Sequence, residues 1–239
     1  MTELPIEVTG SLGRRKAGKS KVLRHLIRTE APKRLMIVDP NGQHRDLCRV
    51  FATKFSQIER PLSNRPASMS ICYMPDETVT EKEAKAGKTV VNKHFDDLCY
   101  MIFEMRDVTI FVEELDEFVT ANYIPPGFQK CVKRGRHRGV RVLWGSQRAA
   151  DIHRKVTSQT EDHYLGAQHE ARDKQYIKEC FGETAKKVAL LRRREFVHWF
   201  DGDELGAVTL KKENGVWSFH PVSLEGRVEG VPVGEEAAA

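Results

Sequence analysis

Cysteine is scarce in this sequence, and the cysteines form no pattern that would hold a metal or a disulfide framework. No C-x-x-C pair is present, and five widely spaced cysteines, in apolar surroundings such as DLCYMIF, are typical of buried free thiols. Histidines such as His163, His169 and His198 have no spacing that indicates metal ligands. We therefore expect neither a structural zinc nor disulfides at Cys48, Cys72, Cys99, Cys131 and Cys180.

Long hydrophobic runs are also absent. No apolar stretch reaches the roughly 20 residues that a membrane helix needs, and the N-terminal MTELPIEVTG lacks the basic and then apolar layout of a secretion signal. We therefore expect a protein of the cytoplasm without membrane insertion. The length of 239 residues, with 40% hydrophobic and 31% charged residues, suits one sizeable α/β domain with its own core.

Acidic residues are nearly missing from one segment. The net charge is only +5, but residues 130–155 contain nine Lys and Arg and a single acid, Asp151. This asymmetry favours a polyanionic partner, although a solvated basic face has the same composition.

Strand-like and helix-like segments alternate along the chain, which indicates a mostly parallel sheet flanked by helices. A polar segment at 76–89 is expected to be a surface loop or an irregular helix. Strand patterns cover residues 6–11, 34–42, 67–74, 107–118, 140–148 and 162–168; helix patterns cover 19–29, 45–55, 91–105, 128–139, 150–159 and 170–182.

The C-terminal part lacks this alternation of strand and helix patterns. Residues 195–222 predict β-structure with turns at Asp201-Gly202 and Asn214-Gly215. Residues 226–239 have no core-forming pattern, and we expect them to be disordered. The fold class predicted is α/β, with residues 1–225 forming one domain.

A phosphate-binding pattern lies in GSLGRRKAGKSK, residues 10–21. Gly13, four further residues and then Gly18-Lys19-Ser20 satisfy G-x-x-x-x-G-K-[ST], between a strand pattern and an amphipathic helix. Backbone amides of such a loop cradle phosphates, Lys19 reaches the β- and γ-phosphates of ATP, and Ser20 ligates Mg²⁺. The predicted ATP-binding segment is Gly13, Arg14, Arg15, Lys16, Ala17, Gly18, Lys19, Ser20 and Lys21.

A strand that ends in acids is the necessary companion of this loop. Four apolar positions of VTIFVEEL precede Glu113 and Glu114. We assign Glu113 to Mg²⁺ and Glu114 to the attacking water. Asp116 and Glu117 form a second acidic pair, which the start of a helix also explains.

Four motifs in order resemble the FtsK–HerA superfamily of hexameric DNA-pumping ATPases, over residues 6–168. VDPNG is similar to the D-P-x-G of HerA-type and conjugative coupling ATPases, and GSQRAADIHRKVTSQTEDHYLG is similar to their strand ending in T-Q-R-P and the helix and strand that follow. The four motifs are GRRKAGKS, MIVDPNGQH, IFVEEL and VLWGSQRAADIHRKVTSQTEDHYLG.

The resemblance implies a P-loop NTPase fold of the RecA/FtsK type and further site residues. The sensing glutamine of the family falls on Gln147, and an arginine finger reaching a neighbouring subunit falls on Arg148 or on Arg134, Arg136 or Arg138. Two departures bear on turnover: Glu113 stands where the family has Asp, and Arg14-Arg15-Lys16 replace small loop residues.

Because the sequence pattern contains little beyond the motor, it most resembles the genome-packaging ATPases of tailless, internal-membrane viruses. The resemblance implies ATP-driven movement of double-stranded DNA by a ring, a hexamer, docked on capsid vertex or portal proteins in the host cytoplasm. The aromatic loop at 121–128 and the arginines at 192–194 are further candidates for DNA contact. The main predicted DNA-binding residues are Lys133, Arg134, Arg136, Arg138 and Arg141.

Three other functions fit part of the pattern. A P-loop kinase or GTPase is one, although the guanine-reading N-K-x-D is missing, because Asn92-Lys93 is followed by His94 and Phe95. A prophage or plasmid DNA-transfer ATPase has the same motifs. A nucleotide-binding regulatory protein would bind ATP with little turnover.

Overall fold

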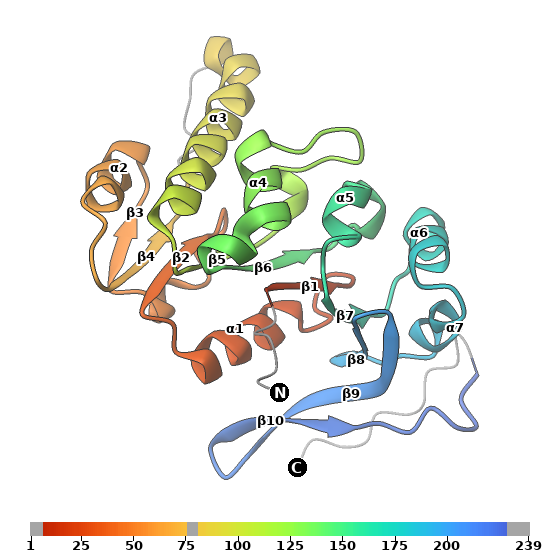
Figure 1. The fold of residues 1–239 in the computed structure, drawn as a ribbon. Helices are drawn as coiled ribbons and strands as arrows, with labels where there is room; N and C mark the ends of the chain where they lie inside the picture. Colours follow the sequence, from red (N-terminus) through yellow and green to blue (C-terminus); the bar gives the residue numbers. More distant parts are fainter. Residues whose placement is uncertain (1–6, 76–80, 229–239) are drawn as a thin grey trace.

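A single mixed sheet organises the chain (Figure 1). The computed structural model describes residues 7–75 and 81–228, apart from the side chains of residues 81–92. The ten strands of the sheet are arranged in the order β10-β9-β8-β7-β1-β6-β5-β2-β4-β3. Seven neighbouring strands from β7 to β3 are parallel, and β8, β9 and β10 extend the sheet in antiparallel fashion. The predicted α/β class with C-terminal β-structure is confirmed.

Apart from β3, the strands follow the predicted patterns closely. The parallel strands are β1 (Val8–Leu12), β2 (Arg34–Val38), β3 (Val50–Ala52), β4 (Met69–Tyr73), β5 (Val108–Val112), β6 (Val140–Ser146) and β7 (Asp162–Gly166). The antiparallel strands are β8 (Glu195–Phe200), β9 (Asp203–Glu213) and β10 (Val216–Pro221). Their connections turn at the predicted Asp201-Gly202 and Asn214-Gly215.

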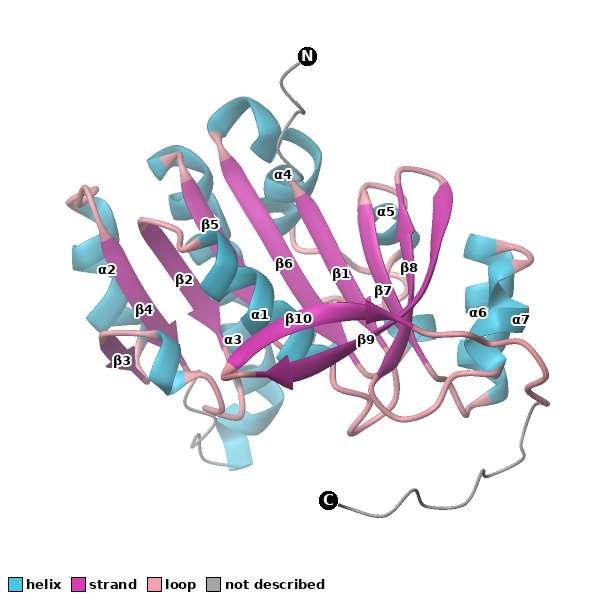
Figure 2. Cartoon of the chain, turned by 90° about the horizontal axis from the view of Figure 1, so that it is seen from below, coloured by secondary structure: helices cyan, strands magenta, loops and turns pink. Residues whose placement is uncertain are grey.

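The helices cover both faces of the sheet unequally (Figure 2). On one face, α1 packs on alternate strand residues such as Ile37, Phe111 and Leu143. The intervening residues, such as Met36 and Ile110, face the other side and form the larger core with the remaining helices. The helices are α1 (Lys19–Glu30), α2 (Phe55–Ser63), α3 (Glu81–Met105), α4 (Pro126–Arg134), α5 (Arg154–Thr157), α6 (Ala171–Phe181) and α7 (Thr184–Ala189).

One predicted helix is wrong. Residues 45–55 form a single 3-10 turn, Arg45–Leu47, followed by the edge strand β3. Leu47, Val50 and Phe51 have helical spacing, but Val50 and Phe51 pair in parallel with β4, opposite Ile71 and Cys72. Pairing with the sheet edge therefore overrides the local pattern. Helices α2, which begins at Phe55, and α7 have no counterpart in the prediction.

The remaining expectations concern thiols, membranes and the less patterned segments. All five cysteines are free, and Cys72, Cys99 and Cys131 are buried, as predicted. Within the described residues, no helix is both long enough and apolar enough to cross a bilayer. The polar segment 76–89 becomes the start of α3 from Glu81 onward, and residues 76–80 lie outside the described residues, as do residues 229–239 of the predicted disordered tail.

Strand order decides where the chemistry-bearing loops meet. In a parallel sheet, the loops after the strands lie at one edge, and ligands bind where neighbouring connections run to opposite faces. Strand β1 lies next to β6, which lies next to β5 and then β2. The loops that follow β1, β2, β5 and β6 therefore converge, although they are far apart in the sequence.

Candidate nucleotide-binding site

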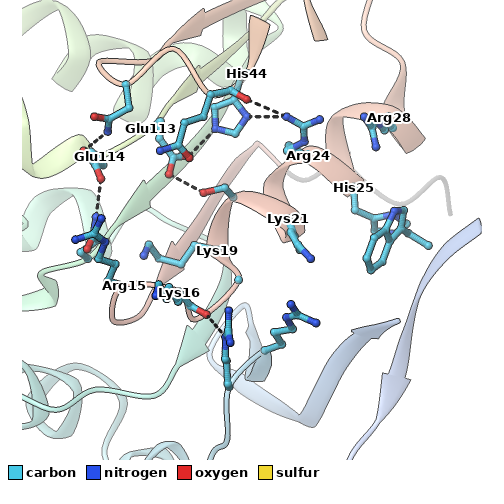
Figure 3. A pocket seen from close by; sticks show the side chains of 18 residues that line it. Arg15, Lys16, Lys19, Lys21, Arg24, His25, Arg28, His44, Glu113 and Glu114 are labelled. Carbon is cyan, nitrogen blue, oxygen red and sulfur yellow. Dashed lines mark hydrogen bonds and ion pairs between the residues drawn. The ribbon is translucent and has the colours of Figure 1, made fainter. Parts of the chain in front are cut away.

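The converging loops surround a cavity of about 870 Å³. Its floor is the phosphate loop and the first turns of α1, and the acids after β5 line one wall (Figure 3). The opposite wall comes from the C-terminal β-region, through Arg193, Arg194 and Trp217. Most of the charged residues that line the cavity are basic.

The phosphate loop has a backbone conformation that its sequence explains. Gly18 caps α1 with φ 105° and ψ 8°, a left-handed conformation that side chains other than glycine rarely adopt. A Cβ there would meet nothing closer than 3.6 Å, so the backbone angle, and not lack of space, requires glycine. The loop is fixed to neighbouring strands, because the Gly13 amide donates to the Ser146 carbonyl at 3.3 Å and the Arg14 amide to the Ala167 carbonyl at 3.1 Å.

Lys19 is folded back over this loop. Its side chain is buried, and Nζ donates to the carbonyl oxygens of Gly13 at 2.8 Å and Arg14 at 3.3 Å. Burial lowers the pKa of Lys19, while the nearby carboxylates, Glu113 first among them, act in the opposite direction. An ammonium held by two weak acceptors in a buried position is available to a phosphate.

Glu113 lies directly opposite Ser20. The Ser20 hydroxyl donates to Glu113 Oε1 at 2.7 Å, and His44 Nε2 lies 3.1 Å from Oε2. His44 is itself buried, and its backbone amide donates to Asp39 at 2.8 Å, which fixes the turn after β2. A hydroxyl beside a carboxylate provides the oxygen donors that Mg²⁺ prefers, so Ser20 and Glu113 fit the predicted metal ligands. No cluster of three or more His, Cys, Asp or Glu suited to a metal occurs among the described residues.

Glu114 is held between two side-chain amides. Gln147 Nε2 donates to Oε1 at 2.5 Å, and Asn41 Nδ2 donates to Oε2 at 2.6 Å. The backbone of Glu114 is left-handed, with φ 51° and ψ 57°. Such a conformation costs about 1–3 kcal/mol in a residue other than glycine and occurs mainly at functional sites. The structure therefore brings Gln147 and Glu114 together, as the sequence predicts, and adds Asn41.

The second acidic pair belongs to a helix start, which was the simpler of the two interpretations. Asp116 and Glu117 lie in the 3-10 turn Leu115–Glu117. Asp116 Oδ1 is buried without a hydrogen-bond partner, and burial raises the pKa of this carboxyl group.

Most of the predicted arginine-finger and DNA-contact residues lie away from this cavity. Arg136 pairs with Glu7 at 3.2 Å and Arg141 with Glu30 at 2.9 Å, at the amino ends of β1 and β6. This is the edge of the sheet opposite the phosphate loop. Arg138 lies 3.8 Å from Glu104, whereas Lys133 and Arg134 are exposed and have no ion pair among the described residues.

Arg148 follows Gln147, but its guanidinium is bound within the chain. Its Nε lies 3.4 Å from the buried carboxylate of Asp173 and 3.9 Å from Asp151. The same Asp173 accepts the Ala150 amide at 2.9 Å. The pairing draws Arg148 toward α6 rather than toward the cavity of its own chain.

Nine residues that line the cavity were not predicted as part of a nucleotide site. Arg193 and Arg194 lie against the phosphate loop. The sequence predicts them only as a DNA contact or a solvated turn. Arg193 Nε donates to the Lys16 carbonyl at 3.4 Å, and Arg194 has a left-handed φ of 69°. No local pattern could place residues so distant in sequence beside the loop. The nine are Arg24, His25, Arg28, Asn41, Gln43, His44, Arg193, Arg194 and Trp217.

Comparison with known proteins was informative only at the level of structure. No family model matches the chain, and no curated protein matches it in sequence. The genome-packaging NTPase B204 of Sulfolobus turreted icosahedral virus 2, bound to AMPPCP, superposes with a TM-score of 0.60 at 16% identity, over 91% of this chain and 99% of that one.

Two bacterial proteins superpose equally well. VirB4 of Thermoanaerobacter pseudethanolicus gives a TM-score of 0.63 at 11% identity, over 87% of this chain and 90% of that one. The bacterial conjugative coupling protein TrwB gives a TM-score of 0.62 at 11% identity, over 94% of this chain and 86% of that one. This chain has a P-loop NTPase fold. The likeness to FtsK–HerA ATPases that the four motifs predict is thus confirmed in the fold.

Proposed function

We propose that this protein hydrolyses ATP and uses the energy to translocate double-stranded DNA, as the packaging motor of a viral genome. The observation that carries the proposal is the meeting of Lys19, Ser20, Glu113, Glu114 and Gln147 in one cavity. Lys19 can bind phosphate, Ser20 and Glu113 can ligate Mg²⁺, and Glu114 and Gln147 can hold the attacking water. The fold shared with the packaging NTPase B204 supports the choice of cargo.

The proposed reaction is attack of water on the γ-phosphorus of ATP. Lys19 and the loop amides bind the β- and γ-phosphates and balance their charge. Glu114 accepts a proton from the attacking water as the bond to phosphorus forms and the bond to ADP breaks. Gln147, which already contacts Glu114, orients that water. Mg²⁺ held by Ser20 and Glu113 would supply charge neutralisation at the phosphate oxygens.

DNA movement requires groups outside the cavity. We propose that several copies form a ring, a hexamer, and that Lys133, Arg134, Arg136, Arg138 and Arg141 form the basic surface toward DNA phosphates. Of these, Arg141 is the weakest candidate, because only 13% of its side chain is exposed and Glu30 already pairs with it. Sequence-independent phosphate contacts suit a motor that moves any sequence.

An arginine from a neighbouring copy would complete the site in this arrangement. Arg134 is the best placed of the four candidates, because it is exposed and has no ion pair among the described residues. Arg136, Arg138 and Arg148 each have an acidic partner and would have to exchange it. Capsid vertex or portal proteins are the partners that a packaging role entails.

A second candidate function is DNA transfer between cells. The fold likeness to the conjugative coupling protein TrwB favours it as specifically as the likeness to B204 favours packaging. Both functions require the same ATP-driven movement of DNA, so they share the first test.

Steady-state ATP hydrolysis, with and without double-stranded DNA, tests the common core of the proposal. We expect DNA to raise turnover and Glu114→Gln to lower kcat at least about 100-fold, the lower end of the range for loss of a general base, while ATP still binds. Glu117→Gln is the matched control, since this exposed acid lies in the same turn but does not line the cavity. Turnover that DNA leaves unchanged would contradict translocation, and full turnover in Glu114→Gln would contradict the assigned base.

A further inference from the structure

The C-terminal hairpin places an aromatic ring at the mouth of the phosphate-loop cavity. Trp217 lines that cavity from β10, as the second residue of the strand after the Asn214-Gly215 turn. Residues two apart on a strand share a face, so Trp217 and Phe219 both face α1. Figure 2 shows β9 and β10 crossing the face of the sheet that carries this helix.

Phe219 anchors the hairpin to the body of the protein. Its ring centroid lies 5.1 Å from that of Tyr164 in a stacked arrangement and 5.2 Å from that of His25 edge to face. Val22 and Phe196 belong to the same apolar cluster. Aromatic pairs at these distances are favourable beyond simple burial, so Phe219 holds the strand that carries Trp217 against α1.

Three cations, Lys21, Arg193 and Arg194, line the cavity together with this ring. Lys21 Nζ lies 5.2 Å from the centre of the Trp217 ring, and Lys21 points toward the C-terminal strands in Figure 3. Desolvation lowers the pKa of Lys21, and Arg194 and Arg193 lower it further. Among the described residues, no carboxylate pairs with any of these three cations. Like charges gathered at a cavity wall favour an anion between them.

The anion site and the aromatic face belong to one ligand-sized space. Lys19 and Ser20 begin α1 beside the phosphate loop, Lys21 on the same turn contacts the Trp217 ring, and all four residues line the same cavity. We propose that Trp217 is the stacking platform for the purine base of the bound nucleotide, while Lys21, Arg193 and Arg194 face its phosphates. This inference rests on the proposed function of the cavity and assigns the part that holds the base.

Stacking has a consequence for base selectivity. An indole recognises the flat face of a base, and adenine and guanine both present such a face. The platform therefore predicts that adenosine and guanosine triphosphates bind with similar affinity. The absence of N-K-x-D from the sequence, which removes the guanine-reading carboxylate, agrees with a base site of low selectivity.

Calorimetric titration of the full chain with AMPPCP, its guanosine counterpart and inorganic tripolyphosphate, each with Mg²⁺, separates the two ends of the cavity. We expect Trp217→Ala to weaken binding of both nucleotides about 5- to 100-fold, the loss of one base–aromatic stack. Binding of tripolyphosphate, which has no base, should stay within about twofold. Trp217→Phe should restore most of the nucleotide affinity, because it keeps an aromatic face.

Control variants make each outcome decisive. Val216→Ala alters an exposed neighbour on the other face of β10 and should leave all three affinities unchanged. Arg193→Ala should weaken all three ligands by the same factor. Nucleotide binding by Trp217→Ala at wild-type strength, or an equal loss for tripolyphosphate, would overturn the base platform. Tripolyphosphate binding that survives Lys19→Ala would contradict the phosphate loop itself, which is a separate result.

Discussion

Glu114 shows how much of this site depends on single residues. A left-handed glutamate with two amide donors is an expensive arrangement that nothing in the local sequence favours. The cost is reasonable if the carboxylate must stay at one point relative to the γ-phosphate. Neutral amides can fix its position without neutralising its charge, whereas an arginine would make it a weaker base.

Removal of Asn41 tests that interpretation. We expect Asn41→Ala to lower kcat about tenfold, because a misplaced base loses much of its effect, with KM for ATP within about twofold. Gln43→Ala is the matched control, since this exposed residue lies in the same turn and also lines the cavity. An unchanged kcat in Asn41→Ala would show that Gln147 alone positions Glu114.

His163, in strand β7, makes the stability of the folded protein depend on pH in the acid range. Both ring nitrogens are buried without a hydrogen-bond partner, and the ring lies against Trp144, Phe181 and Trp199. Burial lowers the pKa of His163 to about 3. In the unfolded chain this histidine takes up a proton near its ordinary value of 6.5, so the unfolded state binds more protons below that pH.

Stability should therefore fall as the pH drops from 6.5 toward 3, by up to about 1.4 kcal/mol per pH unit from this residue. His163→Phe should make the dependence shallower without loss at pH 7, because the aromatic pocket accepts a phenyl ring. Urea unfolding at several pH values measures the effect, with exposed His137→Gln as the control for removal of a histidine. Equal slopes in wild type and His163→Phe would refute this explanation.

The elements also show what a single sequence can predict. Buried parallel strands such as β2 and β5 are short apolar runs that end in turn residues or acids, so pattern alone finds them. Strand β3 was not predicted because a three-residue edge strand has no periodicity of its own and depends on β4 for its hydrogen bonds. The helix start at Leu115–Glu117 could be predicted only as one of two alternatives.

In the candidate site, too, local patterns predict some residues, and the remaining ones depend on how distant segments pack together. Lys19, Ser20 and Glu113 follow patterns that encode chemistry, Gln147 follows from the family resemblance, and the structure brings all four together. Arg193, Arg194 and Trp217 reach the cavity because the antiparallel extension folds across α1, which is a property of topology that no short pattern contains.

At the scale of the whole molecule, the sheet separates two kinds of surface. The carboxyl edge holds the phosphate-loop cavity, and the amino edge holds much of the basic segment around Arg136 and Arg141. In a ring, such a separation would let one copy present its basic edge to a neighbour or to DNA while its own cavity binds ATP.

Displacement of a triplex-forming strand from double-stranded DNA tests translocation, the central claim, most directly. We predict that the wild-type protein displaces the third strand in the presence of ATP and Mg²⁺, and that AMPPCP does not support displacement. Lys19→Ala should be inactive, since it removes the cation that binds the phosphates. ATP hydrolysis by the wild-type protein without any displacement of the third strand would contradict the account, because the motor would then consume ATP without moving along DNA.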